Sequence, residues 1–185
     1  MKGWYTIKAS NDATSANISI YEEIGGWGIT AQQFSEDLKA LGDISHISLH
    51  IHSPGGDVFD GIAIYNLLNK HPAKVTVHID GLAASMASVI AMAGDRIVMP
   101  ENALMMIHNP FTLALGDSEE MRKAIQLLDE VKESIINAYE IKTSMRRFKL
   151  SQLMDAETWM NANKAMEYGF ADGILEDKKK SSDAV

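Results

Sequence analysis

A predicted strand, a glycine turn and a predicted helix follow one another in residues 46–68, which read HISLHIHSPGGDVFDGIAIYNLL. Every second residue of the first part is apolar, as in a strand with one buried face: Ile47, Leu49 and Ile51. The turn Ser53-Pro54-Gly55-Gly56 leads into a segment whose apolar residues recur at helical spacing. This order is typical of an α/β fold in which helices pack on a parallel or mixed sheet.

Similar units lie on both sides of this stretch. Strands are predicted at residues 4–9 and 16–21, joined as a hairpin through residues 10–12, and Thr30 is a suitable N-cap for the helix that follows. After residue 68, a strand at residues 75–79 is expected to turn at residues 81–84 into a helix over residues 85–93. Further strands are predicted at residues 96–99 and 103–107.

A long amphipathic helix is predicted over residues 117–143. Asp117 and Glu120 have the spacing of a capping box, and apolar residues then recur every three to four positions. At 1.5 Å per residue the helix is roughly 40 Å long, more than a domain of this size needs internally. It either packs on another subunit or forms part of the core of its own chain.

Length and composition limit the class of protein. The 185 residues fit a single domain over residues 1–185, with a flexible tail at residues 177–185. The formal net charge of −8 argues against a nucleic-acid partner, because phosphate binding needs a basic face. The chain has no cysteine, so a hydrolase of this sequence must use an oxygen nucleophile, a water or a metal. Without a signal peptide or an apolar run of about 18 residues, we expect a cytoplasmic protein that is not bound to membranes.

Two side chains stand out as candidates for chemistry. Ser85 follows Gly81 and two alanines at the predicted start of a helix, where the positive end of the helix dipole favours a developing oxyanion. His108 ends an apolar strand beside the turn Asn109-Pro110, a common location for catalytic residues. The simpler interpretations are an N-cap serine and a structural histidine. Since His50 and His52 lack further ligands at a recognised spacing, neither a metal nor a cofactor is predicted.

Four motifs together resemble the Clp-type serine peptidases, the family of Clp proteolytic subunits. They are Ser53-Pro54-Gly55-Gly56, the segment around Ser85, Met106-Ile107-His108-Asn109-Pro110, and Glu167-Tyr168-Gly169 with its neighbours. The resemblance covers roughly residues 44–175. It implies a Clp/crotonase-like α/β fold of repeated β-β-α units, with residues 117–143 as a protruding handle helix.

The resemblance also implies roles for site residues. Ser85 would be the nucleophile and His108 the general base, and the backbone N–H groups of Gly56 and Met86 would form the oxyanion hole. Counting back from the Glu167 motif, the aspartate of the family's triad falls on Glu157. A glutamate replaces the aspartate there, so Asp155, two residues earlier, is the alternative acid; we expect Glu157 to serve.

The biological setting is a separate expectation. The motifs around residues 53–61 and 157–160 look most like Clp-like proteases of phages and prophages, which implies trimming of a capsid or scaffold protein during prohead maturation. The enzyme would then act in the host cytoplasm. The family also implies a homo-oligomeric ring of stacked heptamers, with a protein or peptide substrate. Because the first predicted strand begins at residue 4, little length precedes it for a gating loop, so we expect activity without an ATPase partner.

Other functions remain open at this stage. A housekeeping Clp subunit would degrade proteins together with a ring ATPase, and a catalytically silent homologue would serve only as a ring-forming assembly protein. The related signal-peptide-peptidase-like branch uses a serine–lysine dyad and usually a membrane anchor, and neither is evident here. The crotonase fold binds acyl-CoA thioesters and does not need a serine at a helix start together with a His-Asn-Pro sequence.

Overall fold

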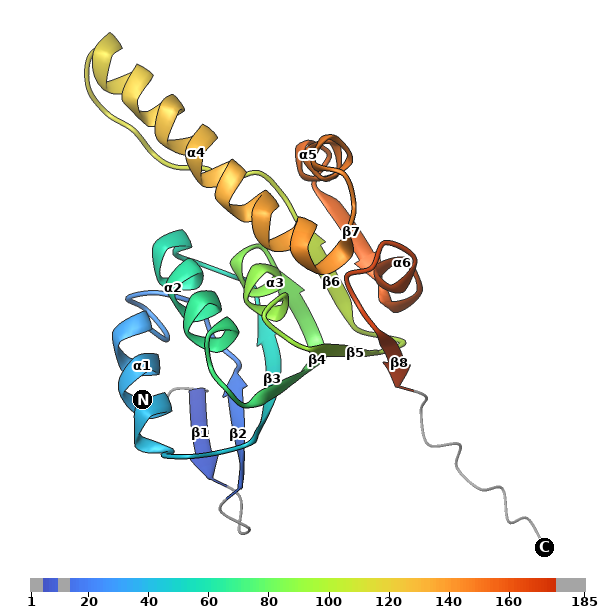
Figure 1. Cartoon of the computed structure of the whole chain (residues 1–185). Coiled ribbons are helices and arrows are strands. Elements are labelled where there is room, and N and C mark those ends of the chain that lie inside the picture. Colours follow the sequence, from blue (N-terminus) through green and yellow to red (C-terminus); the bar gives the residue numbers. More distant parts are fainter. Residues whose placement is uncertain (1–4, 10–13, 176–185) are drawn as a thin grey trace, which may run out of the picture.

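The computed structural model describes residues 5–9 and 14–175, and its strands join one sheet (Figure 1). The first two strands pair antiparallel, which confirms the predicted hairpin. Three predicted regions lie outside the described residues: the connection of this hairpin, the start of its first strand at residue 4, and the tail at residues 177–185. The strands are β1 (Tyr5–Ala9), β2 (Ser15–Ile20), β3 (His46–Ser53), β4 (Lys74–Ala84), β5 (Arg96–Pro100), β6 (Leu104–Ile107), β7 (Thr158–Asn161) and β8 (Gly173–Leu175).

The helices connect these strands as the α/β prediction required. They are α1 (Ala31–Ala40), α2 (Val58–Asn69), α3 (Met86–Ala91), α4 (Ser118–Thr143), α5 (Arg147–Asp155) and α6 (Ala162–Glu167). Strands β2, β3, β4, β5 and β8 pair in parallel in that order, β6 pairs in parallel with β4, and β7 is antiparallel to β6. The mixed α/β architecture with its long handle helix is therefore confirmed.

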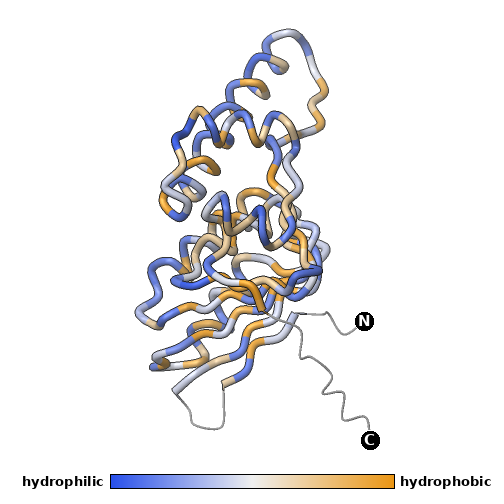
Figure 2. Tube along the Cα trace, turned by 90° about the vertical axis from the view of Figure 1, so that its right-hand side faces the viewer, coloured by the Kyte–Doolittle hydropathy of each residue, from blue (hydrophilic) through white to orange (hydrophobic). Residues whose placement is uncertain are grey.

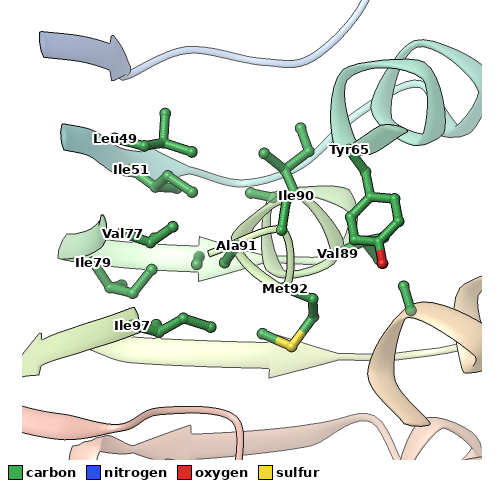
Figure 3. Close-up of a cluster of buried hydrophobic side chains, with 14 of the residues drawn as sticks. Leu49, Ile51, Tyr65, Val77, Ile79, Val89, Ile90, Ala91, Met92 and Ile97 are labelled. Atoms are coloured by element: carbon green, nitrogen blue, oxygen red, sulfur yellow. The ribbon is translucent and has the colours of Figure 1, made fainter. Parts of the chain in front are cut away.

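The core lies between the sheet and the helices. The alternation of apolar and polar residues along the strands is visible in Figure 2. One set of strand side chains points toward α3 (Figure 3), and each of its members is almost completely buried: Leu49, Ile51, Val77, Ile79 and Ile97. From α3, Ile90 and Ala91 meet this face and are equally buried. The helix is thereby fixed against the ends of the central strands, which sets the position of the residue just before it.

The predicted turn at residues 81–84 is wrong, because these residues continue β4. After His78 the strand no longer pairs with β5, and Leu82–Ala84 pair instead with Leu104–Met106 of β6. The change of partner keeps the backbone hydrogen-bonded, so β4 ends only at Ala84. The helix predicted over residues 85–93 is correspondingly shorter and begins after Ser85.

The long helix agrees with the prediction in length and in its N-cap. Asp117 accepts hydrogen bonds from the N–H groups of Glu119 and Glu120, and α4 extends over 26 residues. The reciprocal half of the capping box is absent, since Glu120 pairs with Lys123 instead. The second half of α4 is buried in its own chain, which confirms the core environment for that half, whereas the first half extends away from the other elements (Figure 1). Within the described ranges, none of the helices has the length and apolar character needed to cross a membrane.

Candidate active site

Ser85 lies at a sharp bend between β4 and α3. Its backbone has φ 54° and ψ −127°, a conformation that residues with a side chain rarely adopt. Its side chain makes no capping hydrogen bond to α3, so the interpretation of Ser85 as an ordinary N-cap is wrong. A serine on a strained strand-to-helix bend is the arrangement that exposes a nucleophile in several hydrolases.

Two hydroxyl groups form a chain of hydrogen bonds that ends on the backbone of the strained serine. Ser88 donates from its Oγ to the carbonyl oxygen of Ser85 at 2.6 Å, and the same Oγ lies 2.8 Å from the hydroxyl of Tyr139. Because the single proton of Ser88 is used toward Ser85, Tyr139 is the donor in the second bond. Burial raises the pKa of Tyr139 well above its usual range, which keeps this phenol protonated.

His108 reaches the same serine from the end of β6. Its Nε2 atom lies 2.8 Å from Oγ of Ser85, the distance of a good hydrogen bond. The ring of Phe111 packs edge-on against the imidazole, with 5.8 Å between centroids. Two side chains that are 23 positions apart in the sequence are thus in direct contact, in the geometry of a nucleophile and its base.

The glycine turn after β3 faces this pair. A Cβ atom on Gly55 would lie 2.7 Å from Cβ of Ser85, so only glycine fits at that position. Gly56 has φ 146°, and it lines the same cavity as Ser85 and Met86. Within the described part of the chain, the N–H groups of Gly56 and Met86 have no hydrogen-bond acceptor. Two unpaired backbone donors beside a serine are what an oxyanion hole requires.

A cavity of about 350 Å³ opens beside Ser85 and His108. Its wall is mainly apolar and is contributed largely by α3 and α4, with the following side chains: Val89, Leu127, Leu128, Val131, Ile135 and Tyr139. Glu23 and Asp57 also line it, and no lysine is among the described residues around it. The absence of a lysine there disfavours a serine–lysine dyad in this part of the chain.

The two candidate acids lie near His108, but neither carboxylate contacts the imidazole. Asp155 accepts hydrogen bonds from Asn109 at 2.8 Å and from Lys132 at 2.6 Å. The Lys132 ammonium, together with the Asn109 amide, holds the pKa of the Asp155 carboxyl below its usual range. Glu157 accepts from the indole N–H of Trp159 at 3.2 Å. Of the described side chains, only Ser85 is hydrogen-bonded to His108.

The strand register distinguishes the two acids more clearly than their side-chain contacts do. Ile107 at the end of β6 pairs with Thr158 at the start of β7, in antiparallel register. The next position outward on each strand is His108 on one side and Glu157 on the other. Glu157 has φ 46°, so the backbone turns away from the ladder at this residue. Glu157 therefore directly precedes the residue that pairs beside His108, and its side chain is bonded to Trp159.

Comparison with known proteins agrees with this geometry. The family model described as Clp protease matches residues 7–178. The chain belongs to the Clp protease family. It is therefore a serine-type peptidase, a hydrolase of peptide bonds, as the motifs around Ser85 and His108 had suggested.

Relatives within this Clp protease family are similar over most of their length. The chain is 36% identical over 146 residues to the "ATP-dependent Clp protease proteolytic subunit" of Ligilactobacillus salivarius (strain UCC118), covering 77% of this chain and 74% of the relative. The protein of the same name from Chlorella vulgaris is 34% identical over 137 residues, covering 72% and 68%. Subunit 1 from Chlamydia muridarum (strain MoPn / Nigg) is 35% identical over 130 residues, covering 68% and 67%.

The sequence did not predict several of the contacts made by side chains at this site and by the two histidines discussed above. Ser88 has a local signal, since it lies one helical turn after Ser85, but Tyr139 is 51 positions from Ser88 and belongs to the handle helix. The two histidines considered for a metal site are used otherwise: His50 pairs with Asp80, and His52 packs on Tyr21. Among residues 5–9 and 14–175, no three histidine or acidic side chains are grouped closely enough to hold a metal ion.

Proposed function

We propose that Ser85, His108 and Glu157 form the catalytic triad with which this Clp-family peptidase hydrolyses peptide bonds. The observation that carries the proposal is the 2.8 Å contact between Nε2 of His108 and Oγ of a serine on a strained bend. An ordinary N-cap serine would have its oxygen bonded to the helix backbone instead.

The reaction follows from the positions of these atoms. Oγ of Ser85 attacks the carbonyl carbon of the scissile bond while Nε2 of His108 accepts its proton. His108 then donates this proton to the amine nitrogen as the C–N bond breaks, which leaves an acyl ester on Ser85. A water molecule, deprotonated by the same nitrogen, attacks the ester; the proton returns to Oγ and the carboxylic acid product leaves.

The negative charge on the carbonyl oxygen needs donors that are already in place. The N–H groups of Gly56 and Met86 serve this purpose in our proposal, because both line the cavity at Ser85 and neither is used within the described chain. Met86 is also the first residue of α3, so the positive end of this short helix adds to the stabilisation. Such donors contribute about 3 kcal/mol each to transition-state stabilisation in comparable sites.

Glu157 is the acid that we assign to the triad, and the register of β6 and β7 supports this choice. For Nε2 of His108 to accept a proton, its Nδ1 must carry the hydrogen and donate it to an acceptor. The assignment requires the Glu157 side chain to rotate away from Trp159 toward the end of β6. Asp155 is less suitable because both of its contacts are with other donors, Asn109 and Lys132.

The apolar cavity predicts which peptides are cleaved best. A substrate side chain that precedes the scissile bond and enters between α3 and α4 would be surrounded by apolar groups. Burying a leucine, methionine or phenylalanine there is worth about 2 kcal/mol, or roughly 30-fold in kcat/KM. We expect peptides with these residues at that position to be cleaved about 30-fold faster than peptides with glycine. Aspartate should be disfavoured further, since Glu23 and Asp57 line the cavity.

A panel of fluorogenic peptides that differ only at this position measures the preference. Equal cleavage of the leucine and aspartate peptides would show that this cavity does not receive the substrate side chain.

The working form in our proposal is a homo-oligomeric ring. The first half of α4 and the segment before it carry apolar side chains that a single chain leaves exposed: Phe111, Leu113, Leu115, Ile125 and Leu127. Leu113 and Leu115 are about fully exposed, at 100% and 99%. Exposed apolar surface of this extent favours association. Stacked heptamers, as the family resemblance implies, would cover it.

Two biological settings are compatible with the peptidase. The relatives reported above are named ATP-dependent, and this favours proteolysis together with a ring ATPase over our expectation of ATPase independence. The phage-like motifs around residues 53–61 and 157–160 favour capsid or scaffold trimming. Of the two, we propose the ATPase-assisted subunit as the function that the relatives support best.

The two settings predict opposite responses to an ATPase. We expect a folded, tagged substrate to be degraded only when a Clp ATPase and ATP are both added, while short peptides are cleaved without them. Degradation gels with ATP, with ADP and without ATPase measure this difference. Cleavage of a capsid or scaffold protein without any ATPase would contradict the ATPase-assisted function and support the trimming function instead.

A further inference from the structure

One hydrogen bond connects the segment of the proposed base to that of the proposed acid. Asn109 directly follows His108, and its amide nitrogen donates to Oδ1 of Asp155 at 2.8 Å. Asp155 is the last residue of α5, two positions before Glu157. The contact therefore bridges the ends of β6 and β7 just beyond their last backbone pair, at the place where the two strands diverge.

A lysine of the handle helix binds the same carboxylate and so stabilises this bridge, by which we mean the hydrogen bond between Asn109 and Asp155. Nζ of Lys132 lies 2.6 Å from the same Oδ1 atom of Asp155, and the lysine side chain is only 22% exposed. Lys132 belongs to α4 and directly follows Val131, the first buried residue of that helix. Charge-assisted hydrogen bonds of this length are stronger than neutral ones. Three separate elements, α4, α5 and the segment after β6, thus meet at one carboxylate oxygen.

The orientation of the Asn109 amide is imposed by this carboxylate. A carboxylate only accepts hydrogen bonds, so the amide nitrogen must face Asp155. The amide oxygen is then buried, and it has no partner within the described residues. An unpaired buried oxygen is unfavourable, so the contact with Asp155 outweighs what the amide would gain by another orientation.

We propose that Asp155, held by Lys132, is a positioning residue that fixes the segment after His108 through Asn109. It acts on the base and does not receive a proton from it. The bridge sets the separation between the His108 segment and the turn that carries Glu157, so that a short rotation of the glutamate completes the triad. This inference rests on the triad proposed above and assigns to Asp155 a role different from that of the triad acid.

An exchange of the two partners tests the bridge. In N109D two carboxylates face each other, and we expect kcat to fall about 10- to 100-fold while KM changes less than about threefold, because a small displacement of the base slows the chemical step. In the double variant N109D with D155N, the amide and the carboxylate have changed places, so the hydrogen bond can form in the reverse direction while the ammonium of Lys132 pairs with the carboxylate at position 109. We expect its kcat to return to within about threefold of wild type.

The measurement is steady-state cleavage of a fluorogenic peptide, with kcat expressed per site that a fluorophosphonate can label. A merely structural role would lower the number of labelled sites and leave kcat per site unchanged. A double variant no faster than N109D, or N109D with wild-type kcat per site, would overturn the inference. Failure of wild type to label at all would instead contradict the proposed triad.

A variant of Lys132 gives a second test of the positioning role of Asp155, which can be used if N109D does not fold. K132M keeps the aliphatic stem and removes the charge, and we expect kcat per labelled site to fall about three- to tenfold. The matched control is K74M, which breaks the 2.8 Å ion pair between Lys74 and Asp95 near the start of β4. Equal kcat values for K132M and K74M would overturn the proposed role of the lysine in holding the bridge.

Discussion

Replacement of Ser85 by alanine will lower peptide cleavage about 10⁵- to 10⁶-fold, to the level of the assay background. The substitution removes the only oxygen that His108 contacts within the described structure, and no acyl ester can then form. The alanine is close in size to the serine, so folding and assembly should be retained. Cleavage of a fluorogenic peptide, together with light scattering to establish the oligomeric state, measures both effects.

A matched change at a neighbouring serine separates chemistry from packing. In S88A the nucleophile remains, but its carbonyl oxygen and the hydroxyl of Tyr139 lose their shared partner. We expect this variant to keep measurable activity and to be less stable, because an unpaired buried hydroxyl costs about 1–3 kcal/mol. If S85A retained more than about a thousandth of wild-type activity, Ser85 would not be the nucleophile.

The second large effect is expected at Glu157. E157Q should lower kcat about 10³- to 10⁴-fold, because a neutral amide cannot stabilise the imidazolium form of His108 during the reaction. The kcat of D155N should fall less than about tenfold, since the oxygen of the new amide can still accept hydrogen bonds from Asn109 and Lys132. The comparison uses peptide cleavage at saturating substrate, with oligomeric state checked for each variant.

The two acids give opposite outcomes, so the comparison decides between them. If Asp155 were the triad acid, D155N would show the large fall in kcat that we predict for E157Q. The kcat of E157Q would then be close to that of wild type. Full activity in both variants would show that neither carboxylate assists His108. W159F provides a control for the Glu157 side chain, because it removes the indole N–H to which the carboxylate is bonded and leaves the glutamate in place.

Most of the fold could be predicted because its signals are local. The alternation in β3 and the N-cap Asp117 of α4 each depend on a few neighbouring residues, and both predictions were confirmed. The end of β4 could not be predicted in this way. Residues 81–84 are mostly small and have no strand periodicity; they are extended because Leu104–Met106 of β6, some twenty residues later, supply their hydrogen bonds.

The two residues of the candidate site that lie in contact could be singled out from the sequence for the same reason. Ser85 and His108 lie in short motifs, and the structure brings them into contact. The support of Ser85 by Tyr139 depends on the packing of α4 against α3, which no local pattern indicates. The choice between Asp155 and Glu157 depends on the register of β6 and β7 and on the contact with Lys132, and spacing along the chain does not determine either of them.

The central claim is that Ser85 is a nucleophile activated by His108. Labelling the assembled wild-type protein with a fluorophosphonate and identifying the modified peptide by mass spectrometry tests this claim most directly. We predict one adduct per chain, on Ser85, with the labelling rate reduced at least about a hundredfold in H108A and no label in S85A. An adduct on another residue, or equal labelling rates in wild type and H108A, would contradict the account.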